Sequence, residues 1–366
     1  MSLASSRAAW RSLPAFVIQV VGFQQSWRHY ASLPELENRP EPPAPEESVT
    51  IVIPARNEAG RLPRLLDSLS RLDYPAFRVL VVDDASEDGT AHVALERRCE
   101  VVRLRALPEG WLGKSWACWN GALRSESKWI LFTDADTVHG PVSLGRAVST
   151  ANRTGADMLS VFPCQECRTL WERIILPFAY CLYFAGIRPD LVNTGPRDAL
   201  ANGQYILISK RVYLECEGHS AVRSSIVEDL ALAARVISVG GTVRVFRAQS
   251  DVSVRMYQSL GDIVEGFSKN AASFAFFRLG SGIVVVGLLV TALSQTSRLL
   301  RRPLWPAIGS WLACSRLIAP WYREFGLDGR WAFAYPIAAA AFQLIAIRSL
   351  VKSLLGAQHW RGRRLA

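Results

Sequence analysis

Cysteine and charge are scarce in this chain, and a glycine-rich dinucleotide loop is missing. The seven cysteines are scattered and odd in number, so no disulfide framework is implied, and the reducing cytosol is the expected setting. Cys164 and Cys167 form the only close pair in the sequence, and neither a second pair nor nearby histidines completes a zinc or redox site. No G-x-G-x-x-G motif follows the first predicted strand, which argues against a dinucleotide-binding domain.

Charged residues make up only 20% of the chain, whereas hydrophobic residues make up 50% and the mean hydropathy is positive. Soluble enzymes are usually more polar, so this composition predicts association with a membrane. The formal net charge of +10 suits either nucleic acid or an anionic membrane surface. Basic residues concentrate beside apolar stretches, which favours a membrane and argues against nucleic acid as a partner. They are Arg298, Arg301, Arg302, Lys352, Arg361, Arg363 and Arg364.

The N-terminal part of the chain divides into an apolar and a polar segment. Residues 1–32 contain an apolar stretch, Leu13 to Phe23, which is flanked by arginines and contains Pro14. This stretch is too short to span a bilayer easily, so we expect an interfacial helix, with a signal peptide as the alternative. Residues 33–48 are rich in proline and glutamate and are predicted to form an extended linker.

The residues after this linker predict an α/β domain over positions 49–255. Apolar runs and helical spacing alternate there, which is typical of a parallel sheet with crossover helices. The predicted elements are a buried strand at Val49–Ile53 that Pro54 ends, a helix at Arg61–Leu69, strands at Val79–Val82 and Trp129–Phe132, and a helix from Glu228 to about Ile237.

The C-terminal third predicts a membrane-associated region. An amphipathic interfacial helix is expected over residues 256–275, a transmembrane region over 276–352 and a basic tail over 353–366. Leu279–Ser297 and Trp331–Ile347 are the predicted spanning helices, whereas Pro303–Ser315 is short and interrupted by proline. Two or three spans are therefore possible, and two would keep the domain and the tail together in the cytosol.

A further apolar run lies inside the predicted α/β domain. Ile174–Ile187 carries no charge, but Pro177 interrupts it and it is too short to span a bilayer. It is either a core helix or a surface that dips into lipid.

Four polar clusters carry the chemistry. Asp134 and Asp136 follow a predicted strand, and carboxylates at i and i+2 can share one face and hold a hard divalent cation. An isolated D-x-D is usually only an acidic loop, but here matching clusters precede and follow it. Loops at one edge of a parallel sheet are where ligands bind in such folds. The other clusters are Pro54-Ala55-Arg56-Asn57-Glu58, Asp83-Asp84 with Asp88-Gly89-Thr90, and Glu228-Asp229.

These motifs resemble those of family 2 glycosyltransferases with the GT-A fold. The segments VTIVIPARNE, VVDDASEDGT and FTDADT and the later Glu228-Asp229 carry the resemblance. It is closest to a membrane-bound branch that contains diaponeurosporenoate (carotenoid) glycosyltransferase and hopanoid-associated relatives. It implies a nucleotide-sugar-binding domain with a Rossmann-like mixed sheet, followed by amphipathic and transmembrane helices. Further matching motifs are LPEGWLGK at 107–114, NGQY at 202–205, Gly218-His219, Arg255-Met256-Tyr257, Lys269-Asn270 and WRGR at 360–363.

The resemblance also implies a donor site for a UDP-sugar. Carboxylates and amides suit the base and ribose, because they accept hydrogen bonds from N–H and hydroxyl groups. Lys114 would reach the diphosphate, with a solvated lysine as the alternative, and Asp88-Gly89-Thr90 is interpreted as a turn and helix cap. The residues implied at the donor site are Pro54, Ala55, Asn57, Glu58, Asp83, Asp84, Lys114, Asp134 and Arg255.

The same resemblance implies a metal and a catalytic base. Asp134 and Asp136 would share Mn²⁺ or Mg²⁺, and Asp229 would take the proton of the acceptor hydroxyl in an inverting reaction. Glu228 is assigned partly to a capping box with Ser225 and partly to the acceptor site. His219 either lines the acceptor site or is a loop histidine with its hydrogen bonds satisfied.

The expected function is transfer of a hexose, with glucose as the candidate, from a UDP-sugar to a membrane lipid such as a carotenoid or hopanoid. The enzyme is expected to be a multi-pass protein of the cytoplasmic membrane whose catalytic domain faces the cytosol. The family's processive polysaccharide synthases carry a Q-x-x-R-W motif, and here Arg255-Met256-Tyr257 stands instead. A polysaccharide synthase is therefore the second hypothesis, and a catalytically silent membrane scaffold is the third.

Overall fold

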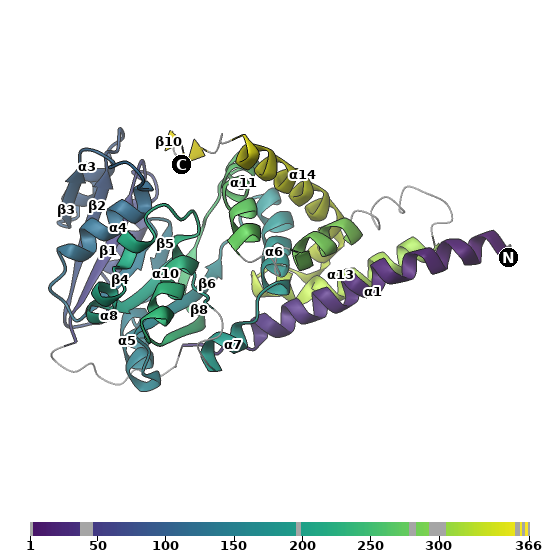
Figure 1. Cartoon of the computed structure of the whole chain (residues 1–366), viewed down its shortest axis with the longest axis horizontal. Coiled ribbons are helices and arrows are strands. Elements are labelled where there is room, and N and C mark those ends of the chain that lie inside the picture. The colour runs from purple at the N-terminus through teal and green to yellow at the C-terminus, as the bar shows by residue number, and fades with distance from the viewer. Residues whose placement is uncertain are drawn as a thin grey trace. The chain divides into compact units, whose positions relative to one another are not determined.

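The computed structural model describes residues 3–36, 47–194, 199–277, 283–292, 305–355, 359–360 and 363–364. The chain forms two compact units, each assembled from separate pieces of sequence (Figure 1). The helical unit consists of Met1–Ser32, Glu166–Arg188 and Tyr257–Trp360. The α/β unit consists of Leu33–Gln165, Pro189–Met256 and Arg361–Ala366. The domain expected over residues 49–255 thus includes one segment that packs within the helical unit.

The described part of the α/β unit is built on a mixed sheet of eight strands in the order β3-β2-β1-β4-β7-β6-β8-β5. Strands β3, β2, β1 and β4 run parallel to one another, whereas β7 is antiparallel to both β4 and β6. A mixed sheet is what the resemblance implied. The strands are β1 (Val49–Ala55), β2 (Phe77–Asp84), β3 (Glu100–Leu104), β4 (Trp129–Thr133), β5 (Thr137–His139), β6 (Met158–Gln165), β7 (Tyr205–Ser209) and β8 (Val243–Val254).

Strand β1 continues beyond the point where its proline was expected to end it. Pro54 stays in register with Val82 of β2, and Ala55 pairs with Asp83. The ladder between β1 and β4 stops earlier, at the pair of Val52 and Phe132. Pro54 has no backbone N–H, and none is needed on the β4 side, because within the described residues β1 has no strand partner there at this position. A proline at a free strand edge is tolerated.

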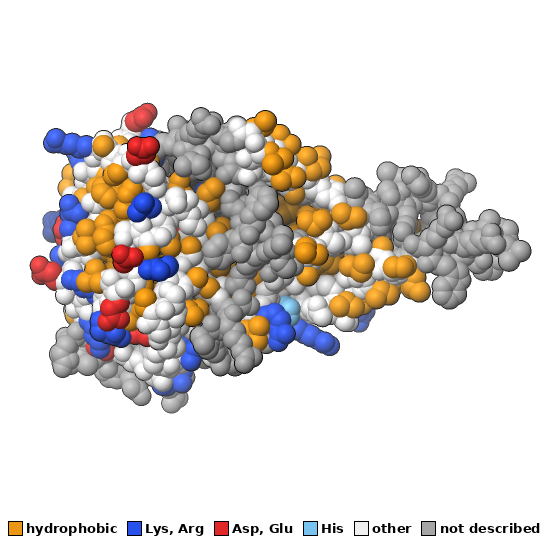
Figure 2. Space-filling model, in the orientation of Figure 1, with side chains coloured by type: hydrophobic (Ala, Val, Ile, Leu, Met, Phe, Trp, Pro, Cys, Tyr) orange, Lys and Arg blue, Asp and Glu red, His pale blue; other side chains and the backbone are white. Residues whose placement is uncertain are grey.

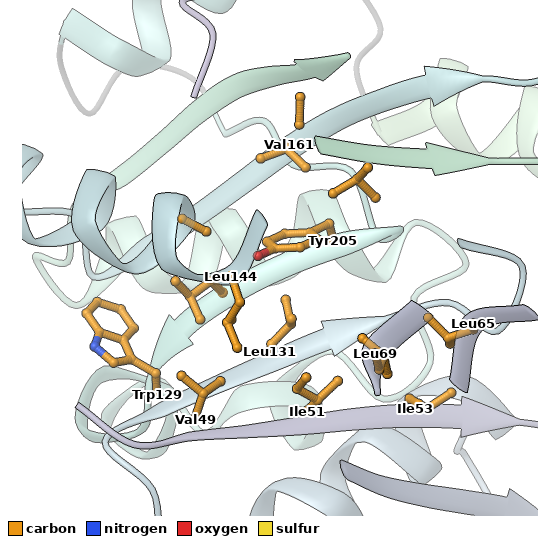
Figure 3. Packing of buried hydrophobic residues seen from close by; sticks show 14 of the residues in the cluster. Val49, Ile51, Ile53, Leu65, Leu69, Trp129, Leu131, Leu144, Val161 and Tyr205 are labelled. Carbon is orange, nitrogen blue, oxygen red and sulfur yellow. The ribbon is translucent and has the colours of Figure 1, made fainter. Parts of the chain in front are cut away.

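Alternate side chains of β1 form the centre of one hydrophobic core. Val49, Ile51 and Ile53 point to the same face of the sheet and are fully buried (Figure 3). Helices α2 (Leu62–Leu69) and α5 (Ser143–Thr154) cover this face with Leu65, Leu69 and Leu144, among others. Burying an aliphatic side chain of this size contributes about 1.5–3 kcal/mol. This core holds the ends of β1, β2 and β4 in fixed positions.

Helix α4 (Gly113–Leu123) packs on the opposite face of β1 and β2. A Cβ on Gly121 would lie 2.3 Å from Cγ1 of Val52, so only glycine allows this close approach. The position of Lys114 at the start of α4 is thereby fixed relative to the sheet. The other helices of the unit are α3 (Thr90–Glu96), α7 (Pro189–Thr194), α8 (Lys210–Glu215), α9 (Gly218–Ala221) and α10 (Glu228–Ser238).

The two ends of the predicted linker pack onto the α/β unit. Leu33 and Leu36 are buried, and Glu35 pairs with Arg247 of β8 through a backbone bridge and a 3.2 Å ion pair. The remaining linker positions, 37–46, lie outside the described residues.

The helical unit packs around buried aromatic side chains. Tyr30, Phe184 and Trp321 have ring centroids 4.9–5.6 Å apart and bring together α1, α6 and α13. Phe23 and Tyr335 add a second contact, at 5.9 Å, between α1 and α14. The described elements are α1 (Leu3–Ala31), α6 (Leu170–Ala185), α11 (Leu260–Phe277), a short helix Ile283–Ala292, α13 (Trp305–Glu324), η1 (Gly329–Ala334), α14 (Tyr335–Leu354) and β9 (His359–Trp360), with β10 (Arg363–Arg364) assigned to the other unit.

Several helices differ in extent from the sequence-based expectations. Helix α1 runs through Pro14 without a break, and α13 is continuous over 20 residues although Pro303–Ser315 predicted a short, interrupted segment. A proline is tolerated in the first turn of a helix, where Pro306 lies. The run Ile174–Ile187 corresponds to α6, whose Ile175 and Phe178 are fully buried in its unit.

The membrane-spanning predictions are tested only in part. Within the described residues, Gly329–Leu354 is the one helix whose length and composition would let it cross a membrane, and it contains the predicted span Trp331–Ile347. The other predicted span, Leu279–Ser297, lies partly outside the described residues, and the helix described there is Ile283–Ala292.

Candidate active site

The D-x-D motif forms a tight turn between β4 and β5. Asp134 and Asp136 lie in this turn, directly after the strand that the sequence predicted. The backbone N–H of Thr137 donates to Asp134 O at 3.2 Å and closes the turn. The backbone N–H of Arg255, at the end of β8, donates to Asp136 O at 3.3 Å. The structure thus brings the predicted metal ligands next to the predicted diphosphate-binding arginine.

Lys114 connects this turn to the start of α10. Its Nζ lies 2.8 Å from Oδ1 of Asp134 and 2.9 Å from Oε1 of Glu228. Burial alone would lower the pKa of Lys114, but the two carboxylates more than compensate and raise it above the usual value. The ammonium group is thus held between two acids, while 33% of the side chain remains exposed.

Asp136 has an unsatisfied carboxylate oxygen. Its Oδ1 is buried and has no hydrogen-bond partner among the described residues. Burial, together with the nearby charges of Asp134 and Glu58, raises its pKa to about 7. A cation beside this oxygen would relieve both effects, so the two aspartates fit a divalent metal as oxygen ligands. No group of three or more His, Cys, Asp or Glu side chains forms a complete metal site in the part of the chain that the structure describes.

Asp229 lies at the N-terminus of α10 with both oxygens hydrogen-bonded. Oδ2 accepts the backbone N–H of Gly203 at 2.9 Å, and Oδ1 accepts that of Leu230 at 2.8 Å. Burial and the neighbouring Glu228 raise the pKa of Asp229 to about 6. The carboxylate is therefore oriented by the backbone and titrates near neutrality, as a general base requires.

Gly203 is the point where these charged groups meet, and the sequence analysis did not select it as a site residue. A Cβ at this position would lie 2.9 Å from Lys114 Nζ, 3.4 Å from Glu228 Oε1 and 3.5 Å from Asp229 Oδ2. Its motif, NGQY, was visible in the sequence only as part of the resemblance. The absence of a side chain at Gly203 leaves room for the three charged groups.

The capping box expected at the start of α10 is not formed. Val227 is the N-cap residue of α10, and no side chain caps this helix end. Glu228 faces Lys114, because the ion pair with this lysine competes with the cap for the carboxylate. The capping box of this type belongs to α6, where Thr169 and Glu172 exchange hydrogen bonds with each other's backbone N–H groups.

The loops after β1 and β2 are joined by hydrogen bonds. The N–H of Asn57 donates to Ser86 Oγ at 3.0 Å, and the N–H of Glu87 donates back to Asn57 Oδ1 at 2.9 Å. Arg56 donates to the backbone oxygen of Asp84 at 2.6 Å. The structure therefore brings together the residues predicted to hold the nucleoside.

The neighbouring turn is held by Asp88. Its Oδ1 accepts the N–H of Thr90 at 2.9 Å, and its Oδ2 accepts the N–H of Ala59 at 3.1 Å. Glu58 N–H donates to Thr90 Oγ1 at 2.8 Å, so this turn also orients the first loop. The interpretation of Asp88-Gly89-Thr90 as a structural turn is confirmed.

His219 is buried and not exposed at an open surface. Its Nδ1 lies 2.9 Å from the hydroxyl of Tyr213, and its ring meets Phe132 edge to face at 4.8 Å. Burial lowers its pKa to about 3, so the ring is neutral at physiological pH. Tyr213, its partner, was not selected from the sequence, because a tyrosine on an amphipathic helix carries no distinguishing signal.

Comparisons with known proteins find glycosyltransferases similar to this chain in sequence and in fold. Residues 50–207 match the family described as Glycosyl transferase family 2. The 4,4'-diaponeurosporenoate glycosyltransferase of Staphylococcus haemolyticus is 30% identical over 62% of this chain and 61% of its own length. The protein of the same name from Staphylococcus aureus (strain USA300) is 30% identical over 63% and 62%. The chain thus spans about three fifths of the length of the curated relatives it matches.

The fold resembles that of a solved glycosyltransferase. The mannosyltransferase PcManGT from Pyrobaculum calidifontis, in complex with GDP-Man and Mn²⁺, superposes with a TM-score of 0.57. It is 16% identical, and the match covers 94% of this chain and 97% of the other. Residues 50–207 of this chain thus match the glycosyl transferase family 2 domain, and the chain shares the fold of this solved glycosyltransferase.

Proposed function

We propose that this chain is an inverting, metal-dependent glycosyltransferase that moves a hexose from a UDP-sugar to a membrane lipid. Glucose is our candidate sugar, and a carotenoid or hopanoid is our candidate acceptor. The observation that carries the proposal is the convergence of Lys114, the D-x-D turn and Asp229 around Gly203. Transfer from a nucleoside diphosphate needs two groups that bind a metal ion, a positively charged side chain for the phosphates and an oriented base.

The donor would lie over the ends of β1, β2 and β4. In this proposal, Asn57, Glu58, Asp83 and Asp84 accept hydrogen bonds from the base and the ribose. The joined loops already fix the backbone of Asn57, Glu58 and Asp84, and the carboxylate of Asp83 accepts the backbone N–H of Ser86. Lys114 would place its positive charge beside the diphosphate. To do so, it would exchange one of its two carboxylate partners for a phosphate oxygen.

Asp134 and Asp136 would hold the Mn²⁺ or Mg²⁺. The unsatisfied Oδ1 of Asp136 and its raised pKa support this assignment. When bound, such a cation would stabilise the negative charge that develops on the departing UDP. PcManGT is described with GDP-Man and Mn²⁺, and we extend the use of a divalent cation to the present chain.

Asp229 would act as the base. It takes the proton of the acceptor hydroxyl while that oxygen forms a bond to the anomeric carbon. The bond from this carbon to the β-phosphate oxygen breaks in the same step, and UDP leaves with the electron pair. A pKa of about 6 keeps Asp229 ionised at neutral pH and still basic enough to accept the proton.

The exposed apolar surface of the helical unit supports a membrane location. On the side of the helical unit that is visible in Figure 2, hydrophobic side chains are gathered. Large exposed apolar patches mark interaction with membranes or partners, and we assign this one to the cytoplasmic membrane, with the catalytic unit on the cytosolic side. The exposed residues include Leu13, Val17, Ile18 and Val21 of α1, and Ile337, Leu344, Ile347, Leu350, Val351 and Leu354 of α14.

The test is a transfer assay with the full chain in lipid vesicles. UDP-glucose, Mn²⁺ and a carotenoid alcohol or a hopanoid alcohol are supplied, UDP release is measured, and the lipid is analysed by mass spectrometry. We expect an adduct of one hexose that is lost in Asp136→Ala and Asp229→Asn protein. Asp67→Asn, which removes an exposed carboxylate of α2 outside the site, serves as the matched control. Absence of UDP release would overturn the proposal, and a water-soluble polymer would replace it with a polysaccharide synthase.

A further inference from the structure

A buried polar cluster lies directly behind the D-x-D turn. Thr133 is the last residue of β4, and Thr137 and His139 begin and end β5, so the three flank the turn. All three are at most 3% exposed. His139 Nε2 lies 3.0 Å from Thr133 Oγ1 and 3.3 Å from Thr137 Oγ1, and the two hydroxyl oxygens are 2.9 Å apart.

Each threonine hydroxyl also contacts a backbone carbonyl. Thr133 Oγ1 donates to Gln204 O at 3.0 Å, and Thr137 Oγ1 donates to Asp134 O at 2.8 Å. Carbonyl oxygens can only accept, so these two bonds use both hydroxyl hydrogens. With both hydroxyl hydrogens directed at these carbonyls, His139 carries its hydrogen on Nε2 and donates it to Thr133 Oγ1. The Nε2–H tautomer is therefore assigned by counting hydrogens.

The cluster reaches beyond the turn to the predicted base. Gln204, whose carbonyl accepts from Thr133, follows Gly203, whose N–H holds Asp229 Oδ2 at 2.9 Å. On the other side, the backbone N–H of His139 donates to Ser68 Oγ of α2 at 3.0 Å. The ring thus lies between the turn that carries two carboxylates and the loop that orients a third.

We propose that His139 is a positioning residue for the D-x-D turn. Through Thr133 and Thr137 it fixes the turn relative to the Gly203 loop, and so sets the distance between the cation-binding carboxylates and Asp229. The inference rests on the proposed function, because it assigns a role within that same site. Partners of metal ligands commonly orient those ligands without touching the metal themselves.

The competing explanation is packing alone. The His139 ring stacks on Tyr205, with ring centroids 5.4 Å apart and an angle of 29° between the planes. Tyr205 belongs to the core of the α/β unit (Figure 3), so a flat ring at position 139 would fill space there. Packing requires the ring, whereas positioning requires the N–H donor, and two substitutions separate these requirements.

His139→Phe keeps a ring but removes the donor, whereas His139→Gln removes the ring and places an N–H close to the position of Nε2. We expect His139→Phe to weaken Mn²⁺ binding in the presence of UDP about 10- to 100-fold, as loss of such partners commonly does. His139→Gln should stay within about threefold of the wild type, below the roughly 10- to 100-fold loss expected when such a partner is removed. Titration of free Mn²⁺ by electron paramagnetic resonance measures the binding without turnover.

Thr150→Val is the matched control. Thr150 is fully buried in α5, and its hydroxyl has no hydrogen-bond partner among the described residues. This variant loses a buried hydroxyl outside the cluster and should bind Mn²⁺ like the wild type. Thr137→Val removes the hydroxyl that donates to Asp134 O and should weaken binding as His139→Phe does.

The reverse order, in which His139→Phe binds like the wild type and His139→Gln does not, would overturn the proposal in favour of packing. Equal loss in both variants together with a lowered melting temperature would do the same. A second readout needs neither metal nor donor: ¹⁵N spectra of the five histidines should show His139 protonated at Nε2. Protonation at Nδ1 would overturn the hydrogen-bond pattern on which the proposal depends.

These readouts also separate the two proposals. A wild-type protein that transfers no sugar, or binds no Mn²⁺ with UDP, would refute the proposed function. The positioning role would then be decided by the His139 tautomer and by the amide shifts of Asp134 and Asp136. Those shifts should move in His139→Phe and stay in place in His139→Gln, and unchanged shifts in both variants would overturn the role.

Discussion

Asp229 shows how a residue's surroundings decide its chemistry. The carboxylate accepts two backbone N–H groups, which fix its direction, while burial and Glu228 keep it more basic than a free aspartate. The acidic pair Glu228-Asp229 was recognisable in the sequence, but the partner of Glu228 was not. Glu228 is turned toward Lys114, a residue more than 100 positions earlier in the chain, and no local pattern predicts that contact.

Replacing Asp229 by asparagine should remove the base and leave the fold in place. We expect kcat to fall about 10²- to 10⁴-fold, the usual contribution of a positioned base. The amide keeps one of the two backbone hydrogen bonds, so the free energy of unfolding should fall by no more than about 2 kcal/mol. Single-turnover transfer and thermal unfolding measure the two quantities. A kcat within threefold of the wild type would assign the base elsewhere.

The pKa of Asp229 also predicts how the rate depends on pH. Below pH 6 the carboxyl is protonated and cannot take the acceptor proton, so kcat/KM should rise about tenfold per pH unit up to that point and then level off. A raised pKa also means that the folded state binds this proton more tightly than the unfolded state, whose aspartate pKa is about 3.9. The stabilisation linked to this proton is complete below about pH 4 and is lost as the pH rises through 6. A rate profile at saturating Mn²⁺ that is flat between pH 5 and 7 would contradict the assignment.

At the scale of helices and strands, local patterns predicted most of the elements that hold the site. Helix α2, strands β2 and β4 and helix α10 lie within a few residues of their predicted bounds, because buried strands and amphipathic helices have strong periodicity. The end of β1 was misplaced at Pro54, since tolerance of a proline depends on which neighbouring strand is present. The short strand β5 was not predicted at all, because three residues are too few to show a period.

The C-terminal end of α5 allows a test of how backbone conformation affects stability. Gly155 ends this helix in the left-handed conformation, with φ of 59°, and a Cβ there would meet no atom within 4 Å. Gly155→Ala should therefore cost about 1–2 kcal/mol through backbone strain alone. Gly60→Ala is the matched control, because that glycine also has open space but no positive φ. It should be neutral or stabilising by up to about 1 kcal/mol. Chemical denaturation compares the two, and equal effects would contradict the role of φ.

At the scale of the whole molecule, the sequence indicated both a catalytic part and a membrane-associated part. It could not show that α6, in the middle of the catalytic sequence, packs with α1 and α13 at the two ends of the chain. Long-range packing of this kind depends on matching aromatic side chains such as Trp27 and Trp321, which are far apart in sequence. Apolar runs locate such helices but do not identify their neighbours.

Removing exposed apolar side chains from α14 should weaken membrane association. Leu344, Ile347 and Leu354 are 70%, 61% and 75% exposed. Replacing all three by serine should lower partitioning into anionic vesicles at least tenfold, since burying one such side chain is worth about 1.5–3 kcal/mol. Vesicle sedimentation measures the partitioning.

The matched control for this surface replaces three leucines of the α/β unit. Leu95, Leu123 and Leu214 are 51%, 53% and 45% exposed, so the triple serine variant loses a comparable apolar surface from the catalytic unit. It should bind vesicles like the wild type. Equal losses in the two triple variants would show that the surface of α14 has no special role at the membrane.

The discontinuous helical unit has a consequence for biosynthesis. Tyr30 of α1 donates a 2.7 Å hydrogen bond to Glu324 at the end of α13, a separation of 294 residues. A ribosome adds about 5–20 residues per second, so α1 is complete roughly 15–60 s before this partner exists. During that interval the aromatic side chains of α1 have none of their later neighbours from α13 and α14. We therefore expect α1 to be sheltered by lipid or by a chaperone until α13 and α14 have been translated.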